Sequence, residues 1–214
     1  MKKYKVTILI DHKNNWIEPF IKEEYNKTNR RFNIKVSKKI EKVIGQDIVF
    51  ILSFTKILPK KFLSSNKLNL VIHESNLPKG KGFSPVQWQI IENKKIINVC
   101  LLKADEKYDS GPIYLREKIN FKGTELLDEI RFQQAKTTIK LINKFLKNFP
   151  NIKSKKQIGK STFYRRRVDS DNEIDINKSI KEQFNILRVS DNRHYPTHFT
   201  YRNNKYFIKI FQSR

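Results

Sequence analysis

Short apolar runs alternate with polar, turn-rich segments over the first hundred residues of the chain. The runs at 5–10, 32–36, 47–52, 68–73 and 96–102 are interpreted as strands. The segments between them predict helices at 20–25, 40–43, 59–63 and 85–92. The run from Ile48 to Leu52 is wholly apolar, as expected for a parallel strand that helices cover on both faces. The alternation predicts an α/β fold, an open and mostly parallel Rossmann-like sheet with helices on both faces.

In the rest of the chain the apolar positions are spaced differently. Residues 113–119 predict one more strand, and residues 123–149 predict a long amphipathic helix that Pro150 ends. Residues 151–160 are polar and lysine-rich, as in a linker. Beyond them the pattern predicts a helix within 175–188 and two strands, 197–201 and 206–211, around a turn at 202–205. We therefore expect a main domain at 1–150 and a small C-terminal α+β appendage at 151–214.

The chain is strongly basic, with 45 Lys and Arg residues against 21 acidic ones and a formal net charge of +24. Such an excess raises nucleic acid as a partner, and it would also attract small anionic ligands. The basic residues are spread along the chain, and clusters interleaved with aromatic residues are not evident. A solvated basic surface therefore explains the charge as well as a nucleic-acid face does, and nucleic acid stays a weaker candidate partner.

The cysteine content and the length of the apolar runs limit the kinds of site and the cellular compartment that we expect for the chain. The single cysteine, Cys100, excludes an internal disulfide and a multi-cysteine zinc site, and it lies in an apolar run as a core residue would. The N-terminal apolar stretch is too short for a signal peptide, and no run approaches the length that spans a bilayer. We expect a soluble protein of the cytoplasm with no membrane partner.

Candidate chemistry begins at His73, which ends a predicted strand. Ligands of open α/β sheets bind beyond the carboxyl ends of the strands, so this histidine is placed to handle a proton or polarise a carbonyl. The Gly- and Pro-rich loop that follows contains Gly80 and Gly82, which allow close backbone approach to a ligand. Lys79 and Lys81 in the same loop could meet phosphates. Taken alone, the segment is also consistent with a structural loop.

A second candidate is Asp109, in the turn Tyr108-Asp109-Ser110-Gly111-Pro112 just before a predicted strand. Taken alone, it is better explained as an aspartate that stabilises the turn.

Together, the two segments resemble the folate-dependent formyltransferases. That family shows Asn-x-His-x-Ser-x-Leu-Pro, then a basic residue and Gly, then Pro-x-x-Trp-x-Ile, and later a Leu-Asp-x-Gly-Pro type turn. The positions in register are His73, Ser75, Leu77, Pro78, Gly82, Pro85, Trp88, Ile90, Asp109, Gly111 and Pro112. The segment 47–59 is similar to the family's strand and folate-contacting loop. The resemblance covers most of residues 5–150.

The resemblance implies an enzyme in which an amine attacks the formyl carbon of 10-formyltetrahydrofolate, with no metal. His73 would polarise the formyl oxygen or stabilise the oxyanion, and Asp109 would hold His73 and help move the amine proton. Expected folate contacts are Phe54, Thr55, Lys56, Ile57, Leu58, Lys107 and Tyr108. Expected contacts of the second substrate are Ser75, Asn76, Lys79, Gly80, Lys81 and Gly82.

One position departs from the family. The Asn expected two residues before the histidine, as oxyanion donor, is Val71 here. Asn69 shares its strand face but lies four residues from His73, ~13 Å along a strand, so it cannot simply substitute. Ser75 and Asn76 are nearer candidates, and backbone N–H groups are another.

The C-terminal segment, residues 161–214 and here called the tail, indicates which amine is formylated. Its segments 163–167, 179–188 and 191–196 resemble the C-terminal part of sugar-nucleotide N-formyltransferases that act on 4-amino-sugar precursors of bacterial surface glycans, including the pseudaminic acid branch. The resemblance implies a nucleotide-linked amino sugar as partner, and a homodimer through the tail is left open. A methionyl-tRNA formyltransferase is the second interpretation: the charge favours it, while the short tail and Val71 count against it. A purine-pathway transformylase ranks third, and a non-catalytic nucleic-acid-binding protein ranks last.

Overall fold

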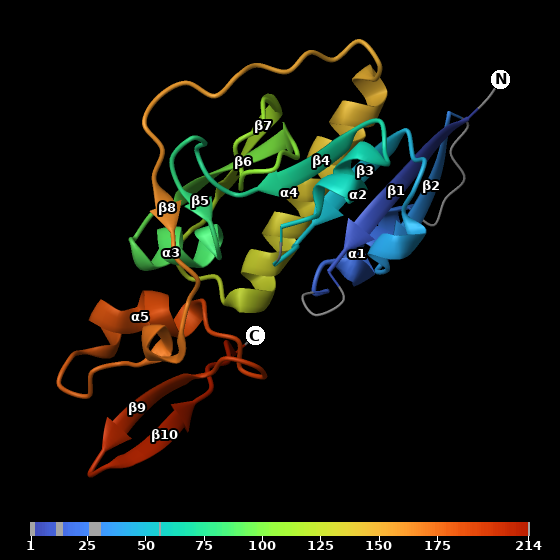
Figure 1. Cartoon of the computed structure of the whole chain (residues 1–214). Helices are drawn as coiled ribbons and strands as arrows, with labels where there is room; N and C mark the ends of the chain where they lie inside the picture. The colour runs from blue at the N-terminus through green and yellow to red at the C-terminus, as the bar shows by residue number, and fades with distance from the viewer. Residues whose placement is uncertain (1–2, 12–14, 26–30, 56, 214) are drawn as a thin grey trace.

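A six-stranded sheet forms the centre of the computed structural model, which describes residues 3–11, 15–25, 31–55 and 57–213. The strand order is β2-β1-β3-β4-β6-β7 (Figure 1). The strands are β1 (Tyr4–Ile10), β2 (Phe32–Ser37), β3 (Ile48–Leu52), β4 (Asn69–His73), β6 (Ile96–Lys103) and β7 (Ile113–Asn120). β1 to β4 pair in parallel, whereas β6 is antiparallel to both of its neighbours. The mostly parallel α/β sheet predicted from the sequence is confirmed.

Helices cover both faces of this sheet. The helical segments of this part of the chain are α1 (Glu18–Tyr25), the 3₁₀ turn η1 (Ile40–Lys42), α2 (Lys60–Ser64), α3 (Pro85–Ile91) and α4 (Leu127–Asn148). α1, α3 and α4 contribute to the larger core cluster, which contains Ile8, Phe50 and Phe145. The neighbouring strand residues Leu9, Val49 and Ile51 pack on the opposite face with Phe62 of α2. Because side chains alternate along a strand, the apolar runs supply both layers at once.

The long helix begins four residues later than its hydrophobic pattern predicts. Gly123 has φ +105°, outside the helical region, and its N–H donates to Glu125. The helix then starts at Leu127, where the Glu129 carboxylate accepts from the N–H of Leu126. Side-chain capping, not hydrophobic periodicity, therefore sets this helix end. No helix among the described residues is long and apolar enough to cross a membrane.

The C-terminal part returns to the loop that follows β4. Ile113 and Lys155 exchange two backbone hydrogen bonds of 2.8 Å, so the segment predicted as a linker is attached to the edge of the sheet. The short strand β8 (Phe163–Tyr164) then pairs with β5 (Lys81–Gly82) in parallel (Figure 1). These pairings bring residues more than eighty positions apart into one layer beside His73.

A helix and a hairpin complete the chain, in agreement with the predicted appendage. They follow the turn η2 (Asp169–Asn172) and consist of α5 (Ile180–Arg188), β9 (Thr197–Tyr201) and β10 (Asn204–Ile208). Ser179 and Glu182 cap α5 reciprocally. The hairpin turn is shorter than predicted, because Arg202 and Asn203 both have positive φ and form a two-residue connection. Figure 1 shows this hairpin projecting from the end of the molecule that lies far from the N-terminus.

Candidate active site

A cleft of ≈ 820 Å³ lies at the carboxyl ends of β3 and β4. Its lining includes the loop after β3, the end of β4, the loop between β6 and β7, the first turns of α4, and parts of the segment after residue 165. The position follows the rule for open α/β sheets, whose ligands bind outside the carboxyl ends of the strands. The chemistry of the site therefore depends on which side chains these loops present.

His73, the last residue of β4, is 5% exposed and lines the cleft. Its Nε2 lies 2.7 Å from the carbonyl oxygen of Gly80, and its Nδ1 lies 3.4 Å from Oδ1 of Asp109. A carbonyl oxygen only accepts, so Nε2 carries a hydrogen. Nδ1 is then the ring nitrogen that remains to exchange a proton with Asp109 or with a ligand.

Asp109 is held in place by backbone and side-chain contacts from three parts of the chain. Its Oδ2 accepts from the N–H of Gly82 at 2.9 Å, while Gln157 donates to its backbone carbonyl at 2.8 Å. Its φ of 47° is left-handed, a conformation that aspartate tolerates better than most residues. The structure thus brings His73 and Asp109 together, although the loop of Asp109 joins two antiparallel strands.

Two glycines make this closeness sterically feasible. A Cβ atom on Gly82, whose φ is +99°, would lie 2.3 Å from the carbonyl oxygen of Tyr164. A Cβ atom on Gly111 would lie 1.9 Å from the carbonyl oxygen of Lys103. Both motif glycines therefore allow one backbone to pack on another, rather than on a ligand.

Glu74 is a cleft residue that the sequence analysis did not assign. It directly follows His73, and burial raises the pKa of its carboxyl group, while neighbouring His73 acts in the opposite direction. Gln134 of α4 donates from Nε2 to Glu74 Oε1 at 3.1 Å and also lines the cleft. The glutamate next to the motif histidine was visible in the sequence, but its partner sixty residues later was not.

The C-terminal segment supplies another wall of the cleft. Arg166 stacks over the ring of Phe83, 4.2 Å from its centroid, and donates to the backbone carbonyl of Thr55 at 3.0 Å. Asp191 pairs with Arg131 of α4 at 2.9 Å. Burial by itself raises the pKa of Asp191, but hydrogen bonds from the backbone N–H of Arg193 and from Arg131 together outweigh it and lower the pKa to about 2. In the sequence the arginine run appeared only as part of a family resemblance, and the structure places Arg166 and Arg167 at the cleft.

Most of the predicted folate contacts line this cleft. They are Phe54, Thr55, Ile57, Leu58, Lys107 and Tyr108. Thr55 donates from its backbone and its hydroxyl group to Asp11 at 3.1 and 2.8 Å, so its side chain fixes the loop. Lys56 lies outside the described residues.

The predicted contacts of the second substrate are placed differently, since only Gly82 of that set lines the cleft. Lys81 is 7% exposed and donates to Ser110 at 2.9 Å, so its ammonium group serves the Asp109 turn instead of a phosphate. Gly80 binds His73 through its carbonyl and Thr162 through its N–H. Ser75 is buried and Lys79 is exposed outside the cleft lining. The loop folds back on itself, which turns these side chains away.

The position of the missing asparagine does face the cleft, because Val71 lines it. Neither of the nearer substitutes does: Asn76 accepts from Arg116 at 3.1 Å, and the Ser75 hydroxyl is buried without a hydrogen-bond partner among the described residues. Asn69 donates to the carbonyl of Leu63 at 2.8 Å. Of these candidates on and after β4, His73 is the one that lines the cleft, and its Nδ1 is a donor when the imidazole is doubly protonated.

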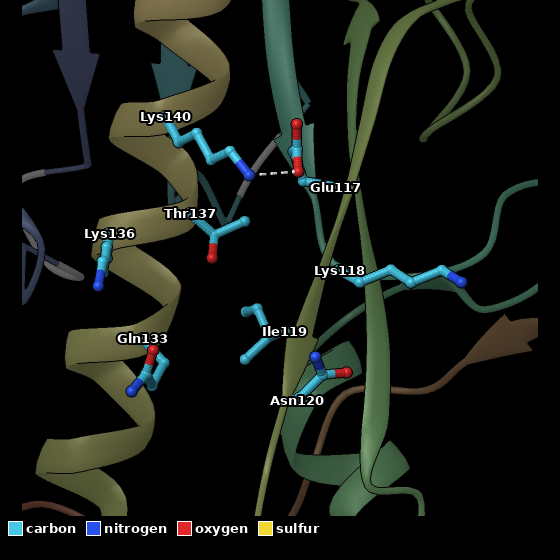
Figure 2. Close-up of a pocket in the computed structure, with 8 residues that line it drawn as sticks. All are labelled: Glu117, Lys118, Ile119, Asn120, Gln133, Lys136, Thr137 and Lys140. Carbon is cyan, nitrogen blue, oxygen red and sulfur yellow. Dashed lines mark hydrogen bonds and ion pairs between the residues drawn. The ribbon is translucent and has the colours of Figure 1, made fainter.

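A second, smaller depression lies between α4 and β7 (Figure 2). Its volume is ≈ 270 Å³, and Glu117, Gln133 and Lys140 are among its lining residues. Glu117 pairs with Lys140 at 2.8 Å and Lys144 at 3.1 Å, and hydrogen bonding to Lys140 lowers the pKa of its carboxyl group. Among the described residues, no group of three or more His, Cys, Asp or Glu side chains is arranged to hold a metal ion.

Comparison with known proteins agrees with this geometry. The family model described as formyl transferase matches residues 2–144. The chain belongs to the formyl transferase family. The matched region contains His73, Asp109 and the start of α4, so it covers most of the cleft lining.

Sequence relatives are named methionyl-tRNA formyltransferase. The relative from Thermodesulfovibrio yellowstonii is 31% identical over 152 residues, which is 69% of this chain and 49% of that protein. The chain thus spans about half the length of the curated relatives it matches.

Solved structures share the fold over nearly the whole chain. A methionyl-tRNA formyltransferase from Clostridium thermocellum has a TM-score of 0.81 at 21% identity, covering 99% of this chain and 94% of that one. A 4-N formyltransferase from Francisella tularensis has a TM-score of 0.72 at 19% identity, covering 99% and 98%. HypX from Aquifex aeolicus, solved in complex with tetrahydrofolic acid, has a TM-score of 0.74 at 13% identity, covering 95% and 37%. At these identities the likeness shows the fold alone.

Proposed function

We propose that the chain transfers the formyl group of 10-formyltetrahydrofolate to the amine of a nucleotide-linked 4-amino-4,6-dideoxy sugar, for surface glycan biosynthesis. The observation that carries the proposal is the His73–Asp109 pair in a cleft that the C-terminal segment helps to line. Membership of the formyl transferase family supports the reaction type. The sugar substrate rests on the tail.

The cleft suits a folate in size and chemistry. Its volume of ≈ 820 Å³ lies within the usual range for small-molecule sites. Phe54, Ile57 and Leu58 supply an apolar wall, and Tyr108 packs edge-on against Phe83 at 5.5 Å between ring centroids. Because Asp11 already occupies the Thr55 hydroxyl, we expect this loop to hold the pterin mainly through its backbone.

The folate, when bound, supplies the formyl carbon. This carbon forms a bond to the amine nitrogen, and its bond to the folate nitrogen breaks. The folate nitrogen then gains the proton that the amine loses. In its doubly protonated form His73 donates from Nδ1 to the developing oxyanion, because its Nε2–H is already bound to the carbonyl of Gly80. Asp109 orients the imidazole and takes part in the proton transfer. With valine at position 71, we assign no other donor on β4 to the oxyanion.

Cationic side chains support a nucleotide-linked acceptor. Arg166 and Arg167 lie at the cleft, where guanidinium groups suit diphosphate oxygens. Burial lowers the pKa of Arg167, yet an arginine so perturbed stays a cation at neutral pH. The Francisella tularensis 4-N formyltransferase resembles the chain over its full length. We also expect nucleotide binding to weaken with increasing salt.

A substrate panel tests the proposal. Purified protein with 10-formyltetrahydrofolate and a set of nucleotide-linked 4-amino sugars should produce one sugar whose mass increases by one formyl group. His73→Ala should abolish this product and keep a wild-type circular dichroism spectrum. A panel without product, together with formylation of charged initiator tRNA, contradicts the sugar assignment.

Methionyl-tRNA formyltransferase activity is the second candidate. It is favoured by the names of the sequence relatives and by the net charge of +24. The distinguishing measurement is tRNA binding at several salt concentrations, because a protein that neutralises many phosphates shows a steep slope of affinity against salt. The homodimer suggested by the tail is likewise a proposal, and analytical ultracentrifugation tests it.

A further inference from the structure

Glu74 has no role in the mechanism above, although it lies in the cleft directly after His73. Its backbone is fixed from α3, since Gln89 donates to the carbonyl of Glu74 at 2.7 Å and to that of Pro85 at 2.8 Å. Its side chain is bound from α4 by Gln134, which is 6% exposed. α3 thus holds the backbone of Glu74 and α4 holds its carboxyl group, beside the candidate catalytic histidine.

Both side chains line the cleft and carry acceptor oxygens. Gln134 donates one N–H of its amide to Glu74, and its Oε1 is buried without a hydrogen-bond partner among the described residues. A buried acceptor left without a donor costs about 1–3 kcal/mol, so a ligand that brings N–H groups gains from meeting it. Arg131, one turn earlier on α4, is paired with Asp191. The wall therefore matches an ammonium or amine group, which is rich in donors.

We propose that Glu74 and Gln134 bind the amino group that is to be formylated, and that Glu74 is the catalytic residue that first accepts its proton. In this step an N–H bond breaks, its electron pair stays on nitrogen as the nucleophilic lone pair, and the proton bonds to a carboxylate oxygen of Glu74. The inference rests on the proposed function only in requiring an amine acceptor, whichever molecule carries it.

The surroundings of Glu74 suit this task. Apart from burial, the groups that act on it are His73 as a cation when protonated, Gln134 and the backbone N–H of Glu74 by hydrogen bonding, and Asp109 as a like charge. Because burial raises the pKa of Glu74, its carboxylate holds a proton more readily than an exposed glutamate does. Asp109 can then serve His73 and the later proton transfer.

Binding to the whole protein tests the inference without turnover. Isothermal titration compares the nucleotide-linked 4-amino sugar that the panel identifies with its 4-hydroxy counterpart. Wild type should prefer the amine by about tenfold or more, and Glu74→Gln should remove this preference while tetrahydrofolate affinity stays unchanged. In steady-state assays Glu74→Gln should lower kcat/KM for the amine about 100-fold, the lower range for a lost general base.

Neighbouring residues provide matched controls. Gln134→Leu should weaken amine binding, whereas Gln133→Leu, one residue earlier and facing the small groove of Figure 2, should not. Glu117→Gln, in that groove, controls for loss of a glutamate charge. If Glu74→Gln does not fold, the Gln134 and Gln133 pair decides the question.

The outcomes separate this inference from the proposed function. A folded Glu74→Gln protein with wild-type kcat/KM and wild-type preference for the amine overturns the inference, as does a Gln134→Leu protein that binds the amine normally. If the wild type formylates no amino sugar, the proposed function fails, and the same variants are then compared with charged initiator tRNA and its deaminated analogue. Absence of a preference for the amine there also overturns the inference.

Discussion

Two depressions lined by α4 each contain a glutamate, and the pKa values of the two carboxyl groups are shifted in opposite directions. In the small groove Glu117 pairs with Lys140 (Figure 2). It also pairs with Lys144, and hydrogen bonding to these lysines lowers the pKa of its carboxyl group. In the cleft Glu74 is bound by the neutral amide of Gln134, and the pKa of its carboxyl group is raised. A protein with a net charge of +24 has many lysines that could pair with a glutamate, yet the side chain that donates to the Glu74 carboxyl group is the neutral amide of Gln134. Environment, more than residue type, separates a structural acid from a candidate functional one.

The largest expected effect concerns the cleft alone. Asp109→Asn keeps a residue type that tolerates positive φ, and it should lower kcat by about 10²–10⁴-fold because proton transfer and orientation of His73 are both lost. Steady-state kinetics measures this. Asp128→Asn, on the exposed first turn of α4, is the control and should retain wild-type kcat. If kcat fell equally in the two variants, the result would contradict a specific role for the cleft residue Asp109.

A smaller effect is expected where the backbone holds the cleft together. Gly82→Ala should lower the free energy of unfolding by roughly 2–4 kcal/mol, because the new Cβ atom meets the Tyr164 carbonyl at a residue with positive φ. Gly45→Ala separates the two causes: its φ is +67°, but nothing lies within 4 Å of the added atom. We expect a cost of about 1 kcal/mol there. Urea unfolding of both variants measures the difference, and equal costs would mean that β5 and β8 separate easily.

The smallest effect compares the two glutamates directly by the pH dependence of stability. Glu117, whose pKa is lowered by folding, contributes stability that is present above its unfolded pKa near 4.5 and is lost as pH falls through the folded pKa. Glu74, whose pKa is raised, contributes stability that is present below its unfolded pKa near 4.5 and is lost as pH rises through the folded pKa. The Glu117→Gln and Glu74→Gln variants should therefore diverge from wild type in opposite directions when urea unfolding is measured from about pH 2.5 to 8. Parallel pH profiles would contradict the difference between the two sites.

Local sequence predicted the framework of the cleft well. The strands of the sheet fall within a residue or so of their apolar runs, because a buried strand must be apolar along its length. His73 was singled out as a candidate because it ends such a strand, and Asp109 because its turn and the His73 segment together resemble a family motif. Hydrophobic pattern was weaker at helix ends, where the Glu125 and Glu129 carboxylates place the start of α4 later than periodicity indicates.

The fate of the loop side chains could not be predicted in the same way. Lys81 appears in the sequence as a free cation for a phosphate, and the structure buries it against Ser110. Gly82 appears as a point of ligand approach, and it meets the backbone of Tyr164. Both depend on β8, which comes eighty residues later and has no distinctive pattern of its own.

The sequence by itself determined the α/β sheet and the family, and it marked His73 and Asp109 as candidate site residues, because these depend on periodicity and on motifs only a few residues long. Only the tertiary structure decided that Glu74 meets Gln134, that Arg166 reaches Phe83, and that Nε2 of His73 is already bound. These contacts join residues from seven to more than eighty positions apart. They depend on the path that the loops take through the fold and not on any periodic pattern in the sequence. Side-chain burial and hydrogen-bond partners depend on that path, so chemistry at this site is set by packing that no local pattern encodes.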